Sequence, residues 1–343
     1  MRAEVDVLVV GAGPGGLAAT LALREAGADV ALVDARDRIG HPIRCAELVR
    51  ERLFTELGLE PASGWIRRRL RVQDRGQKKR ELLTIDRARV EYEVSLIAAE
   101  RGATVAPGTS AIGVGPFDGE RRQVALRTAE SVQTVAARCV IAADGVSSAV
   151  ARMAGIDTFL GPDEVASGLA CRVEDATLAD PEALYMTPLP PAMAPPPFYY
   201  WVVPHGPRSA NVGLALPGRD GARVRRFLSR MMEEDGACRG GRVVETVAGL
   251  LPGKEPLAEP FRDGLLVVGG AARMVHPVSG AGILFAAASG RAAAEHLVQL
   301  GGKAAVAGEL AGYRERVAWI YSQLDEGWQR LRELQQQAGV SGP

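Results

Sequence analysis

The chain opens with a pattern that leaves few choices of fold: a buried strand, a glycine-rich turn and a helix. Residues 4–10, EVDVLVV, form a mainly apolar run with β-branched side chains, as expected for a buried strand. GAGPGG follows directly and opens a segment with helical spacing that ends at Gly27. DVALVD at 29–34 reads as a second short strand. Together these segments predict a βαβ unit, and therefore an α/β fold with a parallel sheet.

The turn after the first strand has the GxGxxG spacing of a dinucleotide-binding loop. Gly11 permits the tight turn, Gly13 lets a pyrophosphate approach the backbone, and Gly16 lets the helix pack on the strand. The helix N-terminus then offers free N–H groups and a partial positive charge to phosphates. Asp34, at the end of the second strand, is placed to accept hydrogen bonds from ribose hydroxyls. Arg36 either contacts a phosphate, as in a site for NADP, or is a solvated surface side chain.

Composition excludes several classes of function. Lys and Arg together number 41 and Asp and Glu together 41, so the chain has no basic excess for binding nucleic acid. The four cysteines are far apart and form no CxxC pair, which predicts neither a metal site nor a disulfide framework. No segment reaches the roughly 18 apolar residues of a membrane-spanning helix. We expect a cytoplasmic protein, monomeric or homodimeric, with peripheral contact to a membrane left open.

The remaining chain alternates between patterns typical of strands and of helices. The predicted elements are a strand, turn and helix at 81–101, several strands up to 145, an antiparallel sheet at 163–217 interrupted by the proline-rich segment 188–197, a helix at 222–249, a strand and a long helix at 264–300, and one or two amphipathic helices in the last forty residues.

Two later segments resemble motifs of the flavoprotein class that includes aromatic hydroxylases and geranylgeranyl reductases. RCVIAADGVSSAVARMAG at 138–155 is similar to the Asp-Gly motif of that class, with Asp144 and Gly145 in its positions. A carboxylate there can organise backbone amides and ribityl or ribose hydroxyls, although an Asp-Gly turn closing a hairpin is the alternative. VVGGAARMVHPVSGAGI at 267–283 resembles the late flavin-binding motif, usually Gly-Asp-Ala-Ala, with Gly270 in place of the acid. The resemblance implies FAD bound in an extended form.

Other segments resemble the geranylgeranyl reductases in particular. RIGHPIRCAELV at 38–49 is similar to their Cys-Ala-Glu segment, which implies a thiol, Cys45, beside the flavin; inert packing is the alternative. TIDRARVEYE at 84–93 resembles their Asp-Arg helix start, which implies that Arg87 reaches the FAD pyrophosphate or ribityl chain. FYYWVVPHG at 198–206 resembles their Tyr-x-Trp strand, with His205 where the family has Lys. Tyr199 and Trp201 share one strand face, either as a wall over the flavin or as ordinary core.

The predicted fold is therefore an α/β, Rossmann-like FAD-binding domain of the GR2 type with an inserted antiparallel-sheet substrate domain and C-terminal helices. The predicted segments are 1–162 and 259–300 for the FAD-binding domain, 163–258 for the substrate domain and 301–343 for the C-terminal helices.

The resemblance to these reductases implies an FAD-dependent reductase of carbon–carbon double bonds in an isoprenoid or other apolar substrate, with NAD(P)H or another electron donor as reductant. One alternative is an FAD-dependent monooxygenase of a small aromatic or natural-product substrate. The other is a noncatalytic flavin-fold protein that binds a ligand. The catalytic candidates are Cys45, Tyr199, Trp201 and His276, with His205 as a second candidate proton donor. The candidates for cofactor binding are Gly11, Gly13, Pro14, Gly15, Gly16, Asp34, Ala35, Arg36, Arg44, Cys45, Ala46, Arg87, Asp144, Gly145, Gly270, Pro277, Gly280, Gly282 and Ile283.

Overall fold

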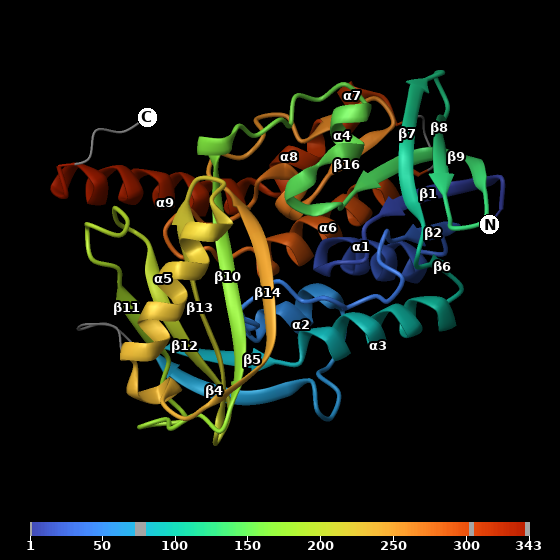
Figure 1. Ribbon diagram of the computed structural model, residues 1–343. Coiled ribbons are helices and arrows are strands. Elements are labelled where there is room, and N and C mark those ends of the chain that lie inside the picture. The colour runs from blue at the N-terminus through green and yellow to red at the C-terminus, as the bar shows by residue number, and fades with distance from the viewer. Residues whose placement is uncertain (1, 73–79, 302–304, 340–343) are drawn as a thin grey trace.

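The computed structural model describes residues 2–72, 80–301 and 305–339, and its strands form three sheets (Figure 1). The strands are β1 Glu4–Val10, β2 Val30–Val33, β3 Leu48–Val49, β4 Ile66–Val72, β5 Arg80–Ile85, β6 Thr104–Ala106, β7 Ser110–Phe117, β8 Arg122–Arg127, β9 Val132–Ala142, β10 Val165–Glu174, β11 Tyr185–Pro188, β12 Tyr199–Gly206, β13 Ser209–Pro217, β14 Arg242–Pro252, β15 Phe261–Arg262 and β16 Leu265–Val267. The α-helices are α1 Pro14–Glu25, α2 Arg52–Leu57, α3 Arg87–Glu100, α4 Ala149–Met153, α5 Gly221–Glu234, α6 Ile283–Gln299, α7 Ala307–Leu310, α8 Gly312–Arg316 and α9 Ala318–Gln337. Short 3₁₀ turns are η1 Gly145–Ser147, η2 Pro162–Glu164, η3 Gly236–Cys238 and η4 Gly269–Ala272.

The largest sheet confirms the predicted Rossmann-like architecture. Its parallel strands follow the order β16-β9-β1-β2-β6, and β7 and β8 join β9 as an antiparallel meander. The first strand is buried from Val7 to Val10 and has neighbours on both sides, which explains the unbroken apolar sequence there; the charged residues Glu4 and Asp6 lie in its less buried first half. The parallel strand ends deliver the glycine-rich turn, the Asp34 turn and the Asp144 turn to one edge of the sheet, where ligands of such folds bind.

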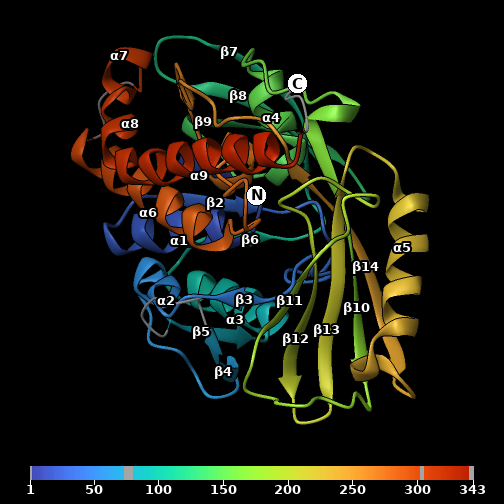
Figure 2. The same cartoon turned by 90° about the vertical axis from the view of Figure 1, so that its left-hand side faces the viewer.

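A five-stranded antiparallel sheet, in the order β11-β12-β13-β10-β14, lies beside the parallel sheet. Helix α5 covers the outer face of this sheet (Figure 2), and Val224 and Leu228 of α5 pack into a core made with the sheet. The sheet falls inside the predicted segment 163–258, and the division of the chain into those four segments stays a proposal.

The predicted helix at 222–249 is wrong in its second half. Helix α5 ends at Glu234, and 242–252 form the edge strand β14, which pairs with β10 along its whole length. Gly240 and Gly241 interrupt the helical segment, and the following VVETV is rich in β-branched residues. Pairing with β10, more than 60 residues earlier in the chain, favours the strand over local helix propensity.

The last part of the chain returns to the parallel sheet. Helix α6 packs against α1, and α8 and α9 lie on the same side (Figure 2). The last forty residues contain three helices in the part described, because two short helices precede the predicted amphipathic one, α9. Within the described ranges, no helix combines the length and the apolarity that crossing a membrane requires.

Candidate functional site

The glycine-rich turn shapes the first half of the site. A Cβ on Gly16 would lie 1.8 Å from the Gly11 carbonyl oxygen, so the helix meets the turn at a distance only glycine allows. A Cβ on Gly13, in contrast, would meet no described atom within 4 Å, so that side of the turn is open. Pro14 and Gly15 start α1, whose N-cap, Gly13, leaves the helix N–H groups without a side-chain cap from the described residues. This geometry suits a pyrophosphate.

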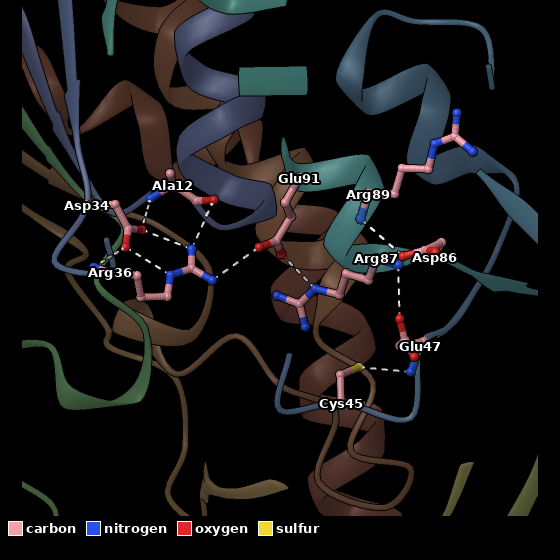
Figure 3. Close-up of polar contacts among 9 residues, drawn as sticks. All are labelled: Ala12, Asp34, Arg36, Cys45, Glu47, Asp86, Arg87, Arg89 and Glu91. Atoms are coloured by element: carbon pink, nitrogen blue, oxygen red, sulfur yellow. Dashed lines mark hydrogen bonds and ion pairs between the residues drawn. The ribbon is translucent and has the colours of Figure 1, made fainter. Parts of the chain in front are cut away.

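A chain of alternating charges runs from this turn toward α3 (Figure 3). Asp34 accepts hydrogen bonds from the Ala12 amide at 2.6 Å and from Nε and Nη2 of Arg36 at 2.9 Å each. Burial opposes the charge of Asp34, but the Arg36 guanidinium and the amides hold its pKa below the usual range. Glu91, fully buried on α3, accepts from Arg36 at 3.3 Å and from Arg87 Nε at 2.7 Å.

This network changes how two predicted residues are interpreted. Arg36 is half-buried and paired with two carboxylates, so the interpretation as a solvated surface side chain is wrong. Asp34 already accepts from Arg36 and two backbone amides, so a ribose hydroxyl must share or displace one of these bonds. Ala35, between them, is exposed.

The segment 38–47, which carries Cys45 and is called the Cys45 loop below, forms the second part of the site. Cys45 is the half-exposed one of the four free cysteines, and the other three are buried. Its sulfur accepts from the Glu47 amide at 3.2 Å and faces the Arg87 guanidinium. Burial lowers the pKa of Arg87, but Glu91 and the Cys45 sulfur outweigh it and raise that pKa above its usual range. Arg44 is exposed and lies against Gly249 of β14.

One face of β12 lies against this loop. Tyr200 and Val202 point into the core under α5, so the alternate residues of the strand point the other way. On that second face, the Tyr199 hydroxyl donates to the Ser279 carbonyl at 2.7 Å, and the Tyr199 and Trp201 rings pack edge to face with centroids 6.0 Å apart. Burial, with a smaller effect of Cys45, raises the pKa of Tyr199 to about 12, so its hydroxyl stays neutral.

Asn211 of β13 connects the aromatic wall to the loop. The Trp201 indole N–H donates to Asn211 Oδ1 at 2.8 Å, and Asn211 Nδ2 donates to the Cys45 carbonyl at 3.0 Å. The ring of Trp201 lies across Gly213, where a Cβ would come within 2.4 Å of it. These two hydrogen bonds therefore fix the position of the Trp201 indole relative to the Cys45 loop.

The two histidines have different surroundings. His276 Nδ1 accepts from the amides of Val278 and Ser279 at 3.3 and 3.2 Å, and a Cβ on Gly327 of α9 would lie 3.0 Å from its Nε2. This geometry favours a loop-capping role for His276, and catalysis by it stays a proposal. His205 is buried, with Nε2 3.4 Å from the Ala46 carbonyl and Nδ1 3.6 Å from Glu47 Oε2.

The Asp144 turn and the late glycine motif meet across η1 and η4. Asp144 Oδ2 accepts from the Val150 amide at 3.0 Å, whereas the buried Oδ1 has no hydrogen-bond partner in the described ranges. A Cβ on Gly270 would lie 3.6 Å from Gly145 Cα, which is ordinary van der Waals contact. The rest of the motif forms the turn before α6: Pro277, Gly280, Gly282 as the N-cap and Ile283 as the first helical residue.

These features fit FAD. The open turn at Gly13, the unpaired Oδ1 of Asp144 and the uncapped N-terminus of α6 leave donors and acceptors for a phosphate, for hydroxyls and for a ring. Cys45 and Ala46, in the Cys45 loop, and Arg87, whose guanidinium faces Cys45, form the other side of this candidate site. That each predicted residue contacts the cofactor stays a proposal.

Three buried polar residues join these parts but are not among the predicted site residues: Glu47, Glu91 and Asn211. Glu91 lies four residues after Arg87, a spacing that pairs opposite charges on a helix. Asn211 is a polar residue within the mainly apolar β13. Glu47 belongs to the quoted Cys-Ala-Glu cluster, and its partners come from distant parts of the chain.

Known proteins resemble this chain in sequence and in fold. The lycopene cyclase protein family model matches residues 6–336. The digeranylgeranylglycerophospholipid reductase of Methanosphaerula palustris is 35% identical over 318 residues, which cover 87% of this chain and 77% of that protein. The crystal structure of a geranylgeranyl bacteriochlorophyll reductase-like protein from Thermoplasma acidophilum has a TM-score of 0.88 at 25% identity, over 96% of this chain and 87% of that one. A flavin-dependent monooxygenase solved with FAD and substrate, 19% identical with a TM-score of 0.72 over 99% of this chain and 66% of its own, shares the fold alone.

Proposed function

Because the chain belongs to the geranylgeranyl reductase family of FAD-dependent oxidoreductases, we propose that it reduces carbon–carbon double bonds in the isoprenoid chains of a lipid. The relatives named as digeranylgeranylglycerophospholipid reductases support this substrate class. The observation that carries the proposal is the meeting of the Cys45 loop, the turn before α6 and the aromatic face of β12. An apolar chain can lie against that face.

The residues of the site have separate tasks in such a reaction. Reduced FAD, when bound, supplies the hydride. Tyr199 and Trp201 provide apolar surface that orients an alkene and excludes water. Arg87 places a permanent positive charge beside the Cys45 sulfur. We propose that Cys45 lies where it can exchange a proton with the bound substrate.

The monooxygenase alternative has weaker support, since the solved monooxygenase shares only the fold. The noncatalytic alternative is not supported, because the relatives that are 34–35% identical to this chain are named as reductases. NAD(P)H or a small electron carrier as reductant, monomeric or homodimeric assembly, cytoplasmic location and peripheral membrane contact are further proposals.

The test is anaerobic turnover of the purified full chain with added FAD. A geranylgeranyl phospholipid is incubated with protein whose FAD is kept reduced by excess dithionite, and the mass of the lipid is followed. We expect each reduced double bond to add two hydrogens, and Trp201→Ala to raise KM more than it lowers kcat. Tyr92→Phe, at an exposed tyrosine of α3, is the control and should behave as the wild type. Product that gains an oxygen atom on admission of air, with no anaerobic product, would favour the monooxygenase instead.

A further inference from the structure

Glu47, in the Cys45 loop, combines an unusual backbone conformation with contacts to three parts of the site. Its backbone has a φ of 60°, a left-handed conformation that non-glycine residues adopt only where surrounding contacts hold them. Its amide donates to Cys45 Sγ at 3.2 Å, and its Oε1 accepts from the Arg87 amide in the first turn of α3 at 3.0 Å. One residue therefore connects the thiol, the helix that carries Arg87 and, through Oε2, the strand β12.

The contact with β12 needs a proton. His205 Nε2 lies 3.4 Å from the Ala46 carbonyl, which can only accept, so the ring proton belongs on Nε2. Nδ1 then presents a lone pair to Glu47 Oε2 at 3.6 Å, and Nδ1 has no hydrogen-bond partner in the part of the chain that the structure describes. At 3.6 Å the two atoms are too far apart for a hydrogen bond, but a neutral carboxylic acid that moves slightly closer can donate to this lone pair. A carboxylate presents only a second acceptor.

The charged groups around Glu47 and His205 do not remove the need for a proton between these two side chains. Arg67 of β4 is paired with Asp86 at 2.9 Å, Arg87 directs its Nε to Glu91, and Arg172 of β10 also faces His205. Burial raises the pKa of Glu47 to about 7, and burial with Arg67 lowers the pKa of His205 to about 4. Both shifts put the single shared proton on the carboxyl group below neutral pH.

We propose that Glu47 is a positioning residue of the site: protonated Glu47 bonds His205 and holds the Cys45 loop against β12 and α3, and loss of its proton loosens the loop. Glu47→Gln can make both hydrogen bonds at every pH, since its side-chain amide can donate to His205 Nδ1 and its oxygen can accept from the Arg87 amide. Glu47→Ala removes both.

The test is hydrogen exchange of the full chain, followed by mass spectrometry on peptides that cover 40–50 and 84–92, with and without added FAD. Rates in the wild type are divided by those of Glu47→Gln at the same pH, which cancels the intrinsic pH dependence of exchange. We expect a ratio near one at about pH 6 and roughly fivefold or more at about pH 8, as the loss of one hydrogen bond predicts. Glu47→Ala should exchange faster than Glu47→Gln at both values.

The matched control is Glu51→Gln, because Glu51 is exposed and pairs only with the exposed Arg69 among the described contacts. It should follow the wild type at both pH values. A wild-type ratio near one at both values would overturn the role of the proton, and slow exchange in Glu47→Ala would overturn the positioning role. The inference rests on the proposed function only for the loop being part of the site. Since no substrate is present, its failure is distinguishable from a failure of turnover.

Discussion

At the scale of single residues, Gly270 is the place where one side chain should change cofactor affinity. Its Cβ position has only ordinary contacts, with Gly145 Cα and the Val146 amide nitrogen at 3.6 Å each, so an aspartate can be accommodated. We expect Gly270→Asp to lower the Kd for FAD about 3- to 30-fold, because the new carboxylate can accept a hydrogen bond from a ribityl hydroxyl. Fluorescence quenching of FAD on titration with protein measures this.

Gly270→Ala and Gly270→Asn separate the causes of any change. Alanine tests the space alone and should leave the Kd near its wild-type value, while asparagine keeps the shape of aspartate with a weaker, neutral acceptor and should fall between the two. An aspartate variant that binds FAD no better than the alanine variant would remove this residue from the flavin site.

Glu47 and His205 should give opposite dependences of stability on pH. The raised pKa of Glu47 contributes stability that is complete below its unfolded value of about 4.5 and is lost as the pH rises through about 7. The lowered pKa of His205 contributes stability that is complete above its unfolded value of about 6.5 and is lost as the pH falls toward about 4. In the wild type the two slopes oppose each other.

Replacing either residue with glutamine removes its contribution to the dependence of the unfolding free energy on pH. Relative to the wild type, the free energy of unfolding of Glu47→Gln should rise between about pH 4.5 and 7, and that of His205→Gln should fall between about pH 4 and 6.5. Each change should be on the order of 2 kcal/mol. Urea unfolding at a series of pH values measures both. Parallel curves for all three proteins would show that neither group titrates as the burial of the pair requires.

At the scale of elements, the contact between α1 and α6 tolerates no added atom. A Cβ on Gly290 of α6 would lie 1.9 Å from the Gly15 carbonyl oxygen in the first turn of α1. We expect Gly290→Ala to destabilise the protein by about 1–3 kcal/mol or more and to weaken FAD binding, since the displaced turn belongs to the glycine-rich loop. Thermal unfolding and the FAD titration measure the two effects.

Gly308→Ala in α7 is the matched control, because a Cβ there would meet no described atom within 4 Å. It should leave the melting temperature unchanged or raise it slightly, as alanine favours a helix over glycine. Equal destabilisation by both substitutions, or none by Gly290→Ala, would show that the α1–α6 contact does not decide the effect.

The elements also show how far local sequence determines this structure. The first strand, turn and helix are predicted because their apolar period, glycines and stop signal all lie within the segment itself. The strand β14 is not, because its conformation depends on pairing with β10. The partners of Arg36 are divided in the same way: Asp34 lies two residues away, but Glu91 is 55 residues distant and buried.

At the scale of the whole molecule, the site depends on contacts that no local pattern contains. The bond from Asn211 to the Cys45 carbonyl spans 166 residues, and the bond from Tyr199 to Ser279 spans 80. The motifs predict that the Cys45 loop and the late glycine turn share a flavin. The meeting of both with one face of β12 follows from the packing of the two sheets.

The packing also divides the interior into two hydrophobic clusters. The larger cluster joins the parallel sheet to the C-terminal helices, and Leu324 of α9 is fully buried in it together with Leu8 of β1. The smaller cluster joins α5 to the five-stranded sheet and contains Leu228. Cooperative units of a protein tend to follow such clusters.

Leu324→Ala and Leu228→Ala are therefore matched substitutions with different expected readouts. Each should cost about 2–5 kcal/mol of local stability, because each leaves a cavity in a closed core. Leu324→Ala should speed hydrogen exchange of the amides of β1 and weaken FAD binding, although α9 lies at the far end of the sequence from the glycine-rich turn. Leu228→Ala should speed exchange in β12 and β13 and leave the FAD Kd close to that of the wild type. If both substitutions accelerate exchange equally in β1 and β13, the two clusters unfold as one unit, and the nucleotide site draws its stability from the whole molecule.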